Sequence, residues 1–240
     1  MHIGSIVDFA QEHIERAIIT GQLEPGQQIK EEEIASALGV SRPPIREAFK
    51  MLETMGLVVR KPRRGVFVVE ITEWDAWEIY TLKAELYALA TRQAFPHLTA
   101  DHLIRMGDIV EAMKVCVAGE PPDILRYQDL NTAFHGVMVE LTGHQRLNGL
   151  IGILHKQVQW FSYRSLSDPD RMKQSCHNHE RILAAILSGD EQETIRLIRE
   201  HVLIGFESSK LERPVKKDDP VTLANGAPPG VPDGMRLFGV

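Results

Sequence analysis

Three histidines, each on the apolar face of a different predicted helix, have the residue type and spacing to bind a metal ion. They are His135 in the segment 122–141, His179 in 169–188 and His201 in 190–211. The three-four spacing of a helix aligns each imidazole with apolar side chains, so all three are expected inside a helical bundle. Asn131 lies one turn before His135 on the same face. Three imidazoles and one oxygen ligand would leave room on a zinc or nickel ion for water or an effector.

Spacing alone leaves other interpretations of these histidines open. A histidine on an apolar face is commonly a core residue with one hydrogen bond, and helical bundles bury such residues for structural reasons. Three histidines around an open site could also activate water in an enzyme. The sequence has no HExxH pattern and pairs none of the candidate ligands with a catalytic carboxylate, which disfavours an enzyme. Cys176 lies three residues before His179 and could be a further ligand or a small buried hydrophobe.

The segments that carry these residues belong to a run of predicted helices. Six helices are expected over 73–95, 100–118, 122–141, 144–164, 169–188 and 190–211. Proline, glycine or a capping residue separates each helix from the next. Thr72 followed by Asp75 has the spacing of a capping box at the start of the first helix. These signals predict an all-helical second domain over residues 72–211.

A second group of functional residues lies in the stretch from Leu38 to Lys50, LGVSRPPIREAFK, which predicts a helix with one basic face. Ser41 is a good N-cap, and Pro43 and Pro44 fit the first turn, where backbone N–H groups lack intrahelical partners. Apolar side chains at helical spacing form the buried stripe, and cations recur every four residues on another face. These cations are Arg42, Arg46 and Lys50. Three cations in a row indicate a polyanionic partner.

The flanking segments complete a winged helix-turn-helix. A helix over 3–20, a short helix over 31–38 and the basic helix are followed by two strands, 57–60 and 66–69. The strands are joined by KPRRG (61–65), a hairpin tip with high positive charge. From Ser41 to Gly65 there are seven Lys plus Arg against two Glu, although the whole chain has a formal net charge of −6. This local excess of cations predicts DNA binding.

The residues LEPGQQI, EEEIASALGVSRPPIREAFKMLETMGLV and RRGVFV resemble the winged-helix domain of the GntR family of bacterial transcription regulators. The resemblance implies that Arg42 and Arg46 contact bases and phosphates in the major groove, while the wing around Arg64 and Gly65 reaches the adjacent minor groove. Glu32 stands where many members have Arg, so an operator contact through that Arg is not carried over. The expected DNA-binding residues are Ser41, Arg42, Pro43, Arg46, Lys50, Arg63, Arg64 and Gly65.

The stretches NTAFHGVMVELTG, HERILAAILSGD and REHV are similar to the FCD-type ligand-binding domain of the FadR subfamily of these regulators. In that subfamily a helical bundle holds a metal through an Asp or Asn, the His one turn on and two later His, and small carboxylate effectors bind beside it. The resemblance gives these roles to Asn131, His135, His179 and His201. A neutral Asn is expected to bind a divalent cation more weakly than Asp. Lys83 stands where many members have an Arg that clamps a carboxylate.

The composition is that of a soluble globular protein. The chain has 240 residues, of which 43% are hydrophobic and 25% charged, enough for two domains. No window approaches 18 uninterrupted apolar residues, so we expect no membrane span and a cytoplasmic location. Cys116 and Cys176 are too few for a disulfide framework. Five prolines and four glycines after residue 212 predict a disordered tail.

Together these features predict a mainly α protein in three parts: a winged helix-turn-helix (1–71) with three helices and a hairpin wing, an all-α six-helix bundle for effector binding and dimerisation (72–211), and a tail (212–240). The expected function is an effector-responsive transcription regulator, a repressor and not an enzyme. It would bind an inverted-repeat DNA operator as a homodimer, together with a divalent metal (Zn, Ni or Mn) and a small carboxylate. The alternatives are a metal-dependent enzyme domain fused to a DNA-binding module, and a regulator whose buried histidines are purely structural.

Overall fold

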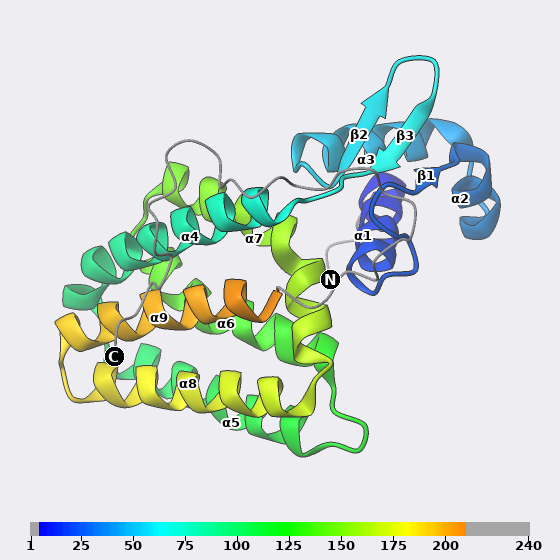
Figure 1. Cartoon of the computed structure of the whole chain (residues 1–240). Helices are drawn as coiled ribbons and strands as arrows, with labels where there is room; N and C mark the ends of the chain where they lie inside the picture. Colours follow the sequence, from blue (N-terminus) through cyan, green and yellow to red (C-terminus); the bar gives the residue numbers. More distant parts are fainter. Residues whose placement is uncertain (1–4, 210–240) are drawn as a thin grey trace, which may run out of the picture. The chain divides into compact units, whose positions relative to one another are not determined.

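The computed structural model describes residues 5–209, which form a mainly helical protein with one small sheet (Figure 1). The predicted winged helix-turn-helix and the predicted helical bundle are both present. The predicted tail, 212–240, lies outside the described residues, as do the predicted helix ends at residues 3–4 and 210–211.

The N-terminal region contains three α-helices: α1 Ile6–Ile19, α2 Glu31–Leu38 and α3 Arg42–Thr54. Ser5 begins α1 through a capping box with Asp8. Gly39 ends α2 with a φ of 65°, a left-handed conformation that glycine adopts without steric cost. The apolar stripe of α3 is buried, as predicted; its members are Ile45, Phe49 and Leu52.

Ser41 occupies the N-cap position of α3, but its side chain makes no capping hydrogen bond. A capping serine accepts from the backbone N–H of the second or third helical residue. In α3 these residues are Pro43 and Pro44, which have no N–H. The predicted start of the helix and the predicted N-cap position of Ser41 are therefore confirmed, although the prolines remove the donors to which its side chain would bond. Ser41 and Pro43 are both exposed.

The wing is part of a three-stranded antiparallel sheet in the order β1-β3-β2. Its strands are β1 Gln28–Ile29, β2 Val58–Lys61 and β3 Gly65–Val68. The two hairpin strands lie one residue away from their predicted bounds. The sequence prediction lacks β1, because a two-residue strand has no periodicity and pairs with a strand far along the chain. Val58, Val66 and Val68 join the core that the sheet shares with the three helices.

Six α-helices form the bundle within residues 72–209. They are α4 Glu73–Ala94, α5 Ala100–Ala118, α6 Ile124–Leu141, α7 Gln145–Leu166, α8 Pro169–Leu187 and α9 Glu191–Ser209, with a short 3-10 helix, η1 Phe95–His97, after α4. Their bounds lie within about two residues of the predicted ones, and Thr72 and Asp75 form the predicted capping box. No helix in the described part of the chain is long and apolar enough to cross a membrane.

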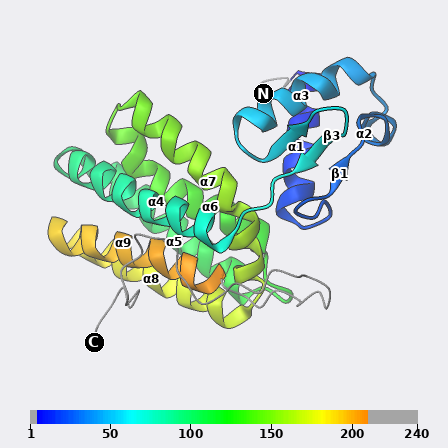
Figure 2. The ribbon, with the colours of Figure 1, turned by 45° about the horizontal axis from the view of Figure 1, so that its top comes forward.

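The bundle packs around one apolar core to which all six helices contribute. The helix α4 lies along α9, and α9 packs on α8, as two views of the ribbon show (Figure 1, Figure 2). The helix α5 packs against both α6 and α8. Because α6, α8 and α9 all contribute to this core, polar residues on their apolar faces can meet inside the bundle.

Candidate metal centre and nucleic-acid interface

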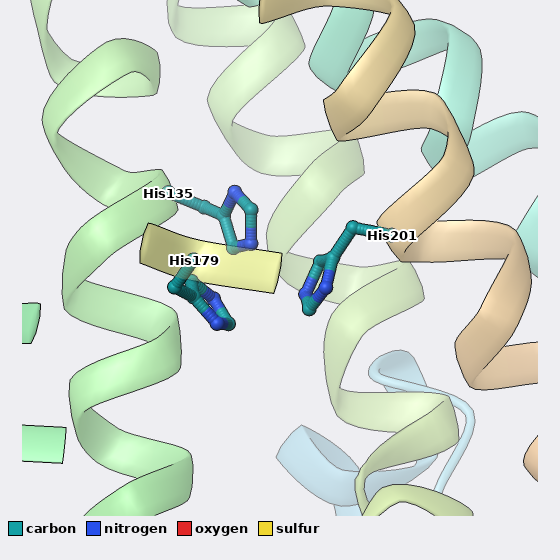
Figure 3. A group of neighbouring side chains, drawn as sticks. All are labelled: His135, His179 and His201. Carbon is teal, nitrogen blue, oxygen red and sulfur yellow. The ribbon is translucent and has the colours of Figure 1, made fainter. Parts of the chain in front are cut away.

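The three candidate histidines come together inside the bundle. His135 projects from α6, His179 from α8 and His201 from α9, and their rings surround a common space (Figure 3). One potential ligand nitrogen of each ring lies within 4.8 Å of the other two. The ring centroids of His179 and His201 are 4.4 Å apart, and each lies 5.3 Å from that of His135. The three imidazoles are therefore close enough to share one cation.

The backbone fixes one ring nitrogen of His179. Its Nδ1 lies 2.8 Å from the carbonyl oxygen of Ser175, one turn earlier in α8. A carbonyl oxygen can only accept, so Nδ1 carries the proton, and in the neutral imidazole Nε2 carries the lone pair. This Nε2 is buried and has no hydrogen-bond partner within residues 5–209. An imidazole oriented by a backbone carbonyl, with its other nitrogen unpaired, is a typical metal ligand.

Burial holds all three imidazoles in the neutral form. It lowers the pKa of His179 to about 4. Burial first, and the neighbouring imidazoles second, lower the pKa values of His135 and His201 well below the ordinary range. Neutral imidazole is the form that binds metals, so these residues can act as ligands at neutral pH.

Two further buried atoms, His201 Nδ1 and Asn131 Oδ1, lack a hydrogen-bond partner in the described structure. Buried polar atoms in proteins are normally paired, and each unpaired one costs about 1 to 3 kcal/mol. His179 and His201 belong to the group of three close imidazoles, so a divalent cation held among them could pair with their unpaired nitrogens. Asn131 lines the same cavity as His135 and His201, and its unpaired oxygen is of a type that binds divalent cations.

A cavity of about 90 Å³ adjoins the imidazoles, and Asn131, His135 and His201 all line it. Its walls also carry Gln159 and Asn178, in which Oε1 and Nδ2 respectively are buried without a partner in the described residues. One of these atoms accepts a hydrogen bond and the other donates one. A small cavity with unpaired donors and acceptors suits a small polar molecule better than an apolar one.

Lys83 lies in α4 on the wall of the same cavity and is buried. Its ammonium nitrogen is 5.4 Å from the ring centroid of Tyr80 and 6.0 Å from that of Tyr87. Burial lowers the pKa of Lys83 to about 8, so the side chain is mostly charged at pH 7. A buried ammonium group is costly unless an anion pairs with it, which makes Lys83 a suitable contact for a carboxylate.

His155 in α7 also lines the cavity, although no sequence pattern predicts a role for it. Its Nε2 lies 2.9 Å from the hydroxyl oxygen of Thr132, and burial lowers its pKa to about 3. Gln159 and Ser162 follow it at helical spacing on the cavity side of α7. This polar row is visible in the sequence, but the approach of α7 to α4 and α6 is a tertiary feature that periodicity does not reveal.

Cys176 is buried, and it is not part of the group of close potential ligands that the described residues contain. Burial raises the pKa of its thiol, which disfavours the thiolate form that binds metals. Cys176 belongs to the apolar core of the bundle together with Cys116. Its interpretation as a small buried hydrophobe therefore fits the structure.

The basic face of α3 is exposed, as predicted. The side chains of Arg42, Arg46 and Lys50 are 54%, 57% and 64% exposed, respectively. Lys50 pairs with Glu47 on its own helix, at 2.8 Å. Both arginines instead bond to Glu31, the first residue of α2: Nε of Arg42 and Nε of Arg46 lie 2.9 and 2.8 Å from its Oε1. The spacing of residues in the sequence does not predict this contact of Glu31.

Basic side chains at the wing tip lie around one aromatic ring. The Nζ atom of Lys61 is 4.7 Å from the ring centroid of Phe67, and the guanidinium carbon of Arg64 is 5.8 Å from it. Such cation–π contacts hold long flexible side chains at the tip. Lys61 is therefore a further candidate DNA contact, in addition to the residues predicted from the sequence.

The backbone of the tip makes a tight turn that β1 supports. Arg63 and Gly65 both have positive φ, 59° and 101°. Nε2 of Gln28 in β1 donates to the carbonyl oxygen of Arg64 at 2.7 Å. The predicted wing residues Arg63, Arg64 and Gly65 therefore lie together at the hairpin tip, and a hydrogen bond from β1 holds this tip in place.

Two family models match this chain. The model described as bacterial regulatory proteins of the gntR family matches residues 6–68, and the FCD domain model matches residues 78–203. The first range contains the basic helix and the wing, and the second contains the three histidines and most of the cavity wall.

Two relatives of known name are transcription regulators, and one solved structure has a similar fold. YdhC of Bacillus subtilis, named as an uncharacterised helix-turn-helix transcriptional regulator, is 26% identical over 195 residues, 80% of this chain and 84% of the relative. The gluconate operon transcriptional repressor of Bacillus licheniformis is 30% identical over 167 residues, 69% of this chain and 66% of the relative. The solved structure of McbR/YncC from E. coli has a TM-score of 0.75 at 20% identity and covers 86% of this chain and 98% of that one, which shows a common fold.

Proposed function

This chain belongs to the GntR family of bacterial transcription regulators and carries an FCD domain. On this basis we propose that it binds an operator through α3 and the wing. We also propose that its helical bundle binds a divalent metal and a small carboxylate. As a member of a family of regulators, it is not an enzyme. In this proposal Arg42 and Arg46 contact base edges and phosphates in the major groove, and Arg64 at the wing tip enters the minor groove.

The operator is proposed to be a short inverted repeat bound by a homodimer. A single winged helix presents one recognition helix and one wing, which is a small contact area for a specific site. Two copies related by a two-fold axis would place two recognition helices on two-fold symmetric DNA. Footprinting on a selected operator, together with the mass of the free protein in solution, tests this point.

The metal proposal depends on one observation, the group of buried unpaired atoms at His179, His201 and Asn131. Together with His135 they would supply three nitrogens and one oxygen to a divalent cation. A nitrogen-rich set favours Zn or Ni, and Mn is a weaker candidate because it prefers oxygen ligands. The metal would add a positive centre beside the cavity and connect α6, α8 and α9 at one point.

The effector is proposed to be a small carboxylate. Lys83 contributes a buried positive charge to the cavity wall, and its burial is costly in the absence of an anion. A bound metal would add further positive charge at His135 and His201, which line the same cavity. The volume of about 90 Å³ favours a molecule of few carbon atoms.

We propose that the effector controls a repressor. The gluconate operon relative is named a transcriptional repressor. Only residues 69–72 separate β3 from α4, so a change in bundle packing can reach the DNA-binding region through a short connection. Any such effect must be reciprocal: if the effector weakens DNA binding, the operator weakens effector binding by the same factor.

Two measurements test the ligand part of the proposal. Metal analysis of protein purified without a histidine tag should give close to one divalent ion per chain. A thermal-shift screen of small carboxylates, with and without added Zn, should find compounds that raise the unfolding temperature, because a ligand that binds only the folded state stabilises it by mass action. If the protein held no metal and gained no stability from Zn, Ni or Mn, the histidines would be structural.

A further inference from the structure

We propose that Glu31 is a positioning residue for base recognition, which holds Arg42 and Arg46 in the orientation that reads DNA. This inference rests on the proposed function of α3 as the recognition helix. Glu31 is the first residue of α2, while the two arginines lie one turn apart on α3. One carboxylate therefore joins the two helices of the helix-turn-helix at the base of the basic face.

The three side chains form a compact group. Nε of Arg42 donates to Oε1 of Glu31 at 2.9 Å, and Nε of Arg46 lies 2.8 and 2.9 Å from Oε1 and Oε2. The carboxylate is only 20% exposed, whereas both guanidinium side chains are more than half exposed. Hydrogen bonds from Arg46 are the largest of the causes that lower the pKa of the Glu31 carboxyl. The carboxylate thus lies behind the arginines, and the arginines extend into solvent.

The bonds recorded within this group use only the Nε atom of each arginine. A guanidinium group has five N–H donors in one plane, and four of them are on the two terminal nitrogens. A carboxylate bonded at Nε fixes the plane and direction of the group while those terminal donors remain available. Bidentate contact with a guanine edge depends on such a fixed plane, so Glu31 can support base reading without taking part in it.

A carboxylate at this place has two opposite effects on DNA binding. Its negative charge repels phosphates, which weakens binding to any duplex. Its hydrogen bonds restrict the two arginine side chains before DNA binds, so less side-chain entropy is lost when a base is contacted, and binding to the operator sequence is strengthened. A positioning role therefore predicts that removing Glu31 raises affinity for unrelated DNA while lowering the preference for the operator.

Glu32 provides a matched control. It lies in the same first turn of α2, carries the same charge at the same helix end and is exposed. No hydrogen bond or ion pair to either arginine is recorded for it among residues 5–209. Replacing Glu32 changes the local charge and the helix-dipole interaction as replacing Glu31 does, but leaves the arginines held.

The experiment measures affinity for an operator selected from random duplexes by the wild-type protein, and for a shuffled duplex of equal length, at one salt concentration. Glu31→Ala and Glu32→Ala should both bind the shuffled duplex more tightly, by a similar factor. Only Glu31→Ala should lower the ratio of operator affinity to shuffled-duplex affinity. The expected decrease is about tenfold, which is the discrimination that one well-formed bidentate contact provides. Glu31→Gln, which keeps one acceptor oxygen, should give an intermediate ratio. Equal unfolding temperatures of the alanine variants show that the fold is kept.

The background of Arg46→Ala separates the positioning role from the recognition surface itself. If Glu31 acts through Arg46, adding Glu31→Ala to that variant should lower the ratio by less than it does in the wild type. A ratio in Glu31→Ala equal to or above that of the wild type, with Arg46→Ala clearly impaired, overturns the positioning role alone. If Arg46→Ala itself keeps the wild-type ratio, the recognition surface is wrong and the role of Glu31 falls with it.

Discussion

The imidazoles of His179 and His201 lie with their ring centroids 4.4 Å apart and their planes at 70°, although they come from different helices. Each ring has a buried nitrogen without a partner in the described structure. Leaving two such atoms unpaired costs about 1 to 3 kcal/mol each, which is large against a total folding stability of about 5 to 15 kcal/mol. A bound cation would remove this cost.

We therefore expect His179→Ala and His201→Ala each to lose stoichiometric metal. In both variants the rise in unfolding temperature on adding Zn should disappear, because two imidazoles and an amide bind a divalent ion much more weakly than three imidazoles do. Metal content by elemental analysis and unfolding with and without Zn measure this. Basal operator binding should persist, since Arg42 and Arg46 are on α3.

The control for this prediction is His177→Ala. His177 is on α8, two residues from His179, but it is exposed and pairs with Glu180 at 3.3 Å. This variant should keep its metal and its response to Zn. Full metal content in either His179→Ala or His201→Ala would show that the assigned centre is wrong.

Asn131 should set the affinity of the centre. Asn131→Asp adds a negative charge to the ligand set and is expected to tighten divalent metal binding by roughly tenfold or more, whereas Asn131→Ala should weaken it. Competition with a chelator of known affinity measures both changes. Equal affinities in the wild type and the two variants would mean that the Asn131 side chain is not a ligand.

The sequence was sufficient for most helix positions because their end signals are local. Thr72 and Asp75 form the predicted capping box, Gly143 lies between α6 and α7, and Pro169 is the first residue of α8, as expected. The convergence of the three histidines follows from periodicity, since each lies on the apolar face of its helix. Ser41 takes the predicted N-cap position, but its side chain makes no capping bond because prolines occupy both donor positions, a fact that the sequence already contains.

Features that depend on pairing between distant segments were not predictable in this way. The strand β1 has two residues and exists only through its partner β3. Glu31 lies on a different helix from Arg46, and nothing in the spacing of α2 points to that bond. His155 reaches the cavity because α7 packs beside α4 and α6. Each of these three features depends on tertiary packing, which sequence periodicity does not predict.

Lys83→Met should make the free protein more stable and its effector response weaker. At pH 7 the folded state holds a buried ammonium group whose pKa is lowered to about 8, and methionine of similar shape removes that charge. The expected gain is about 1 to 3 kcal/mol in the free energy of unfolding. Chemical denaturation of metal-free protein measures it. A loss of stability would indicate that Lys83 has a structural role.

The same residue predicts a pH dependence of effector binding. The pKa of Lys83 is depressed in the folded protein, so the unfolded chain binds more protons between about pH 8 and 10, and stability should rise with pH in that window. A carboxylate pairs only with the charged form, so effector affinity should fall about tenfold per pH unit above pH 8. Calorimetric titration from pH 7 to 9.5 tests this, and Lys83→Met should show no such fall.

The recognition surface can be tested at its two ends. Arg46→Ala should cost about 1 to 3 kcal/mol of operator binding if its guanidinium contacts a guanine edge, and Arg64→Ala should reduce affinity and lower the slope of log affinity against log salt by about one. The control is Arg196→Ala on α9, an exposed arginine paired with Glu193 and Glu200 on the same helix, which should change neither quantity. Fluorescence anisotropy over a salt series measures all three variants. Arg46 and Arg64 are exposed, so their substitution leaves the core intact, and a loss of binding at equal unfolding temperature can be assigned to the DNA contact. If both variants kept the wild-type affinity and salt slope, the interface would lie elsewhere on the chain.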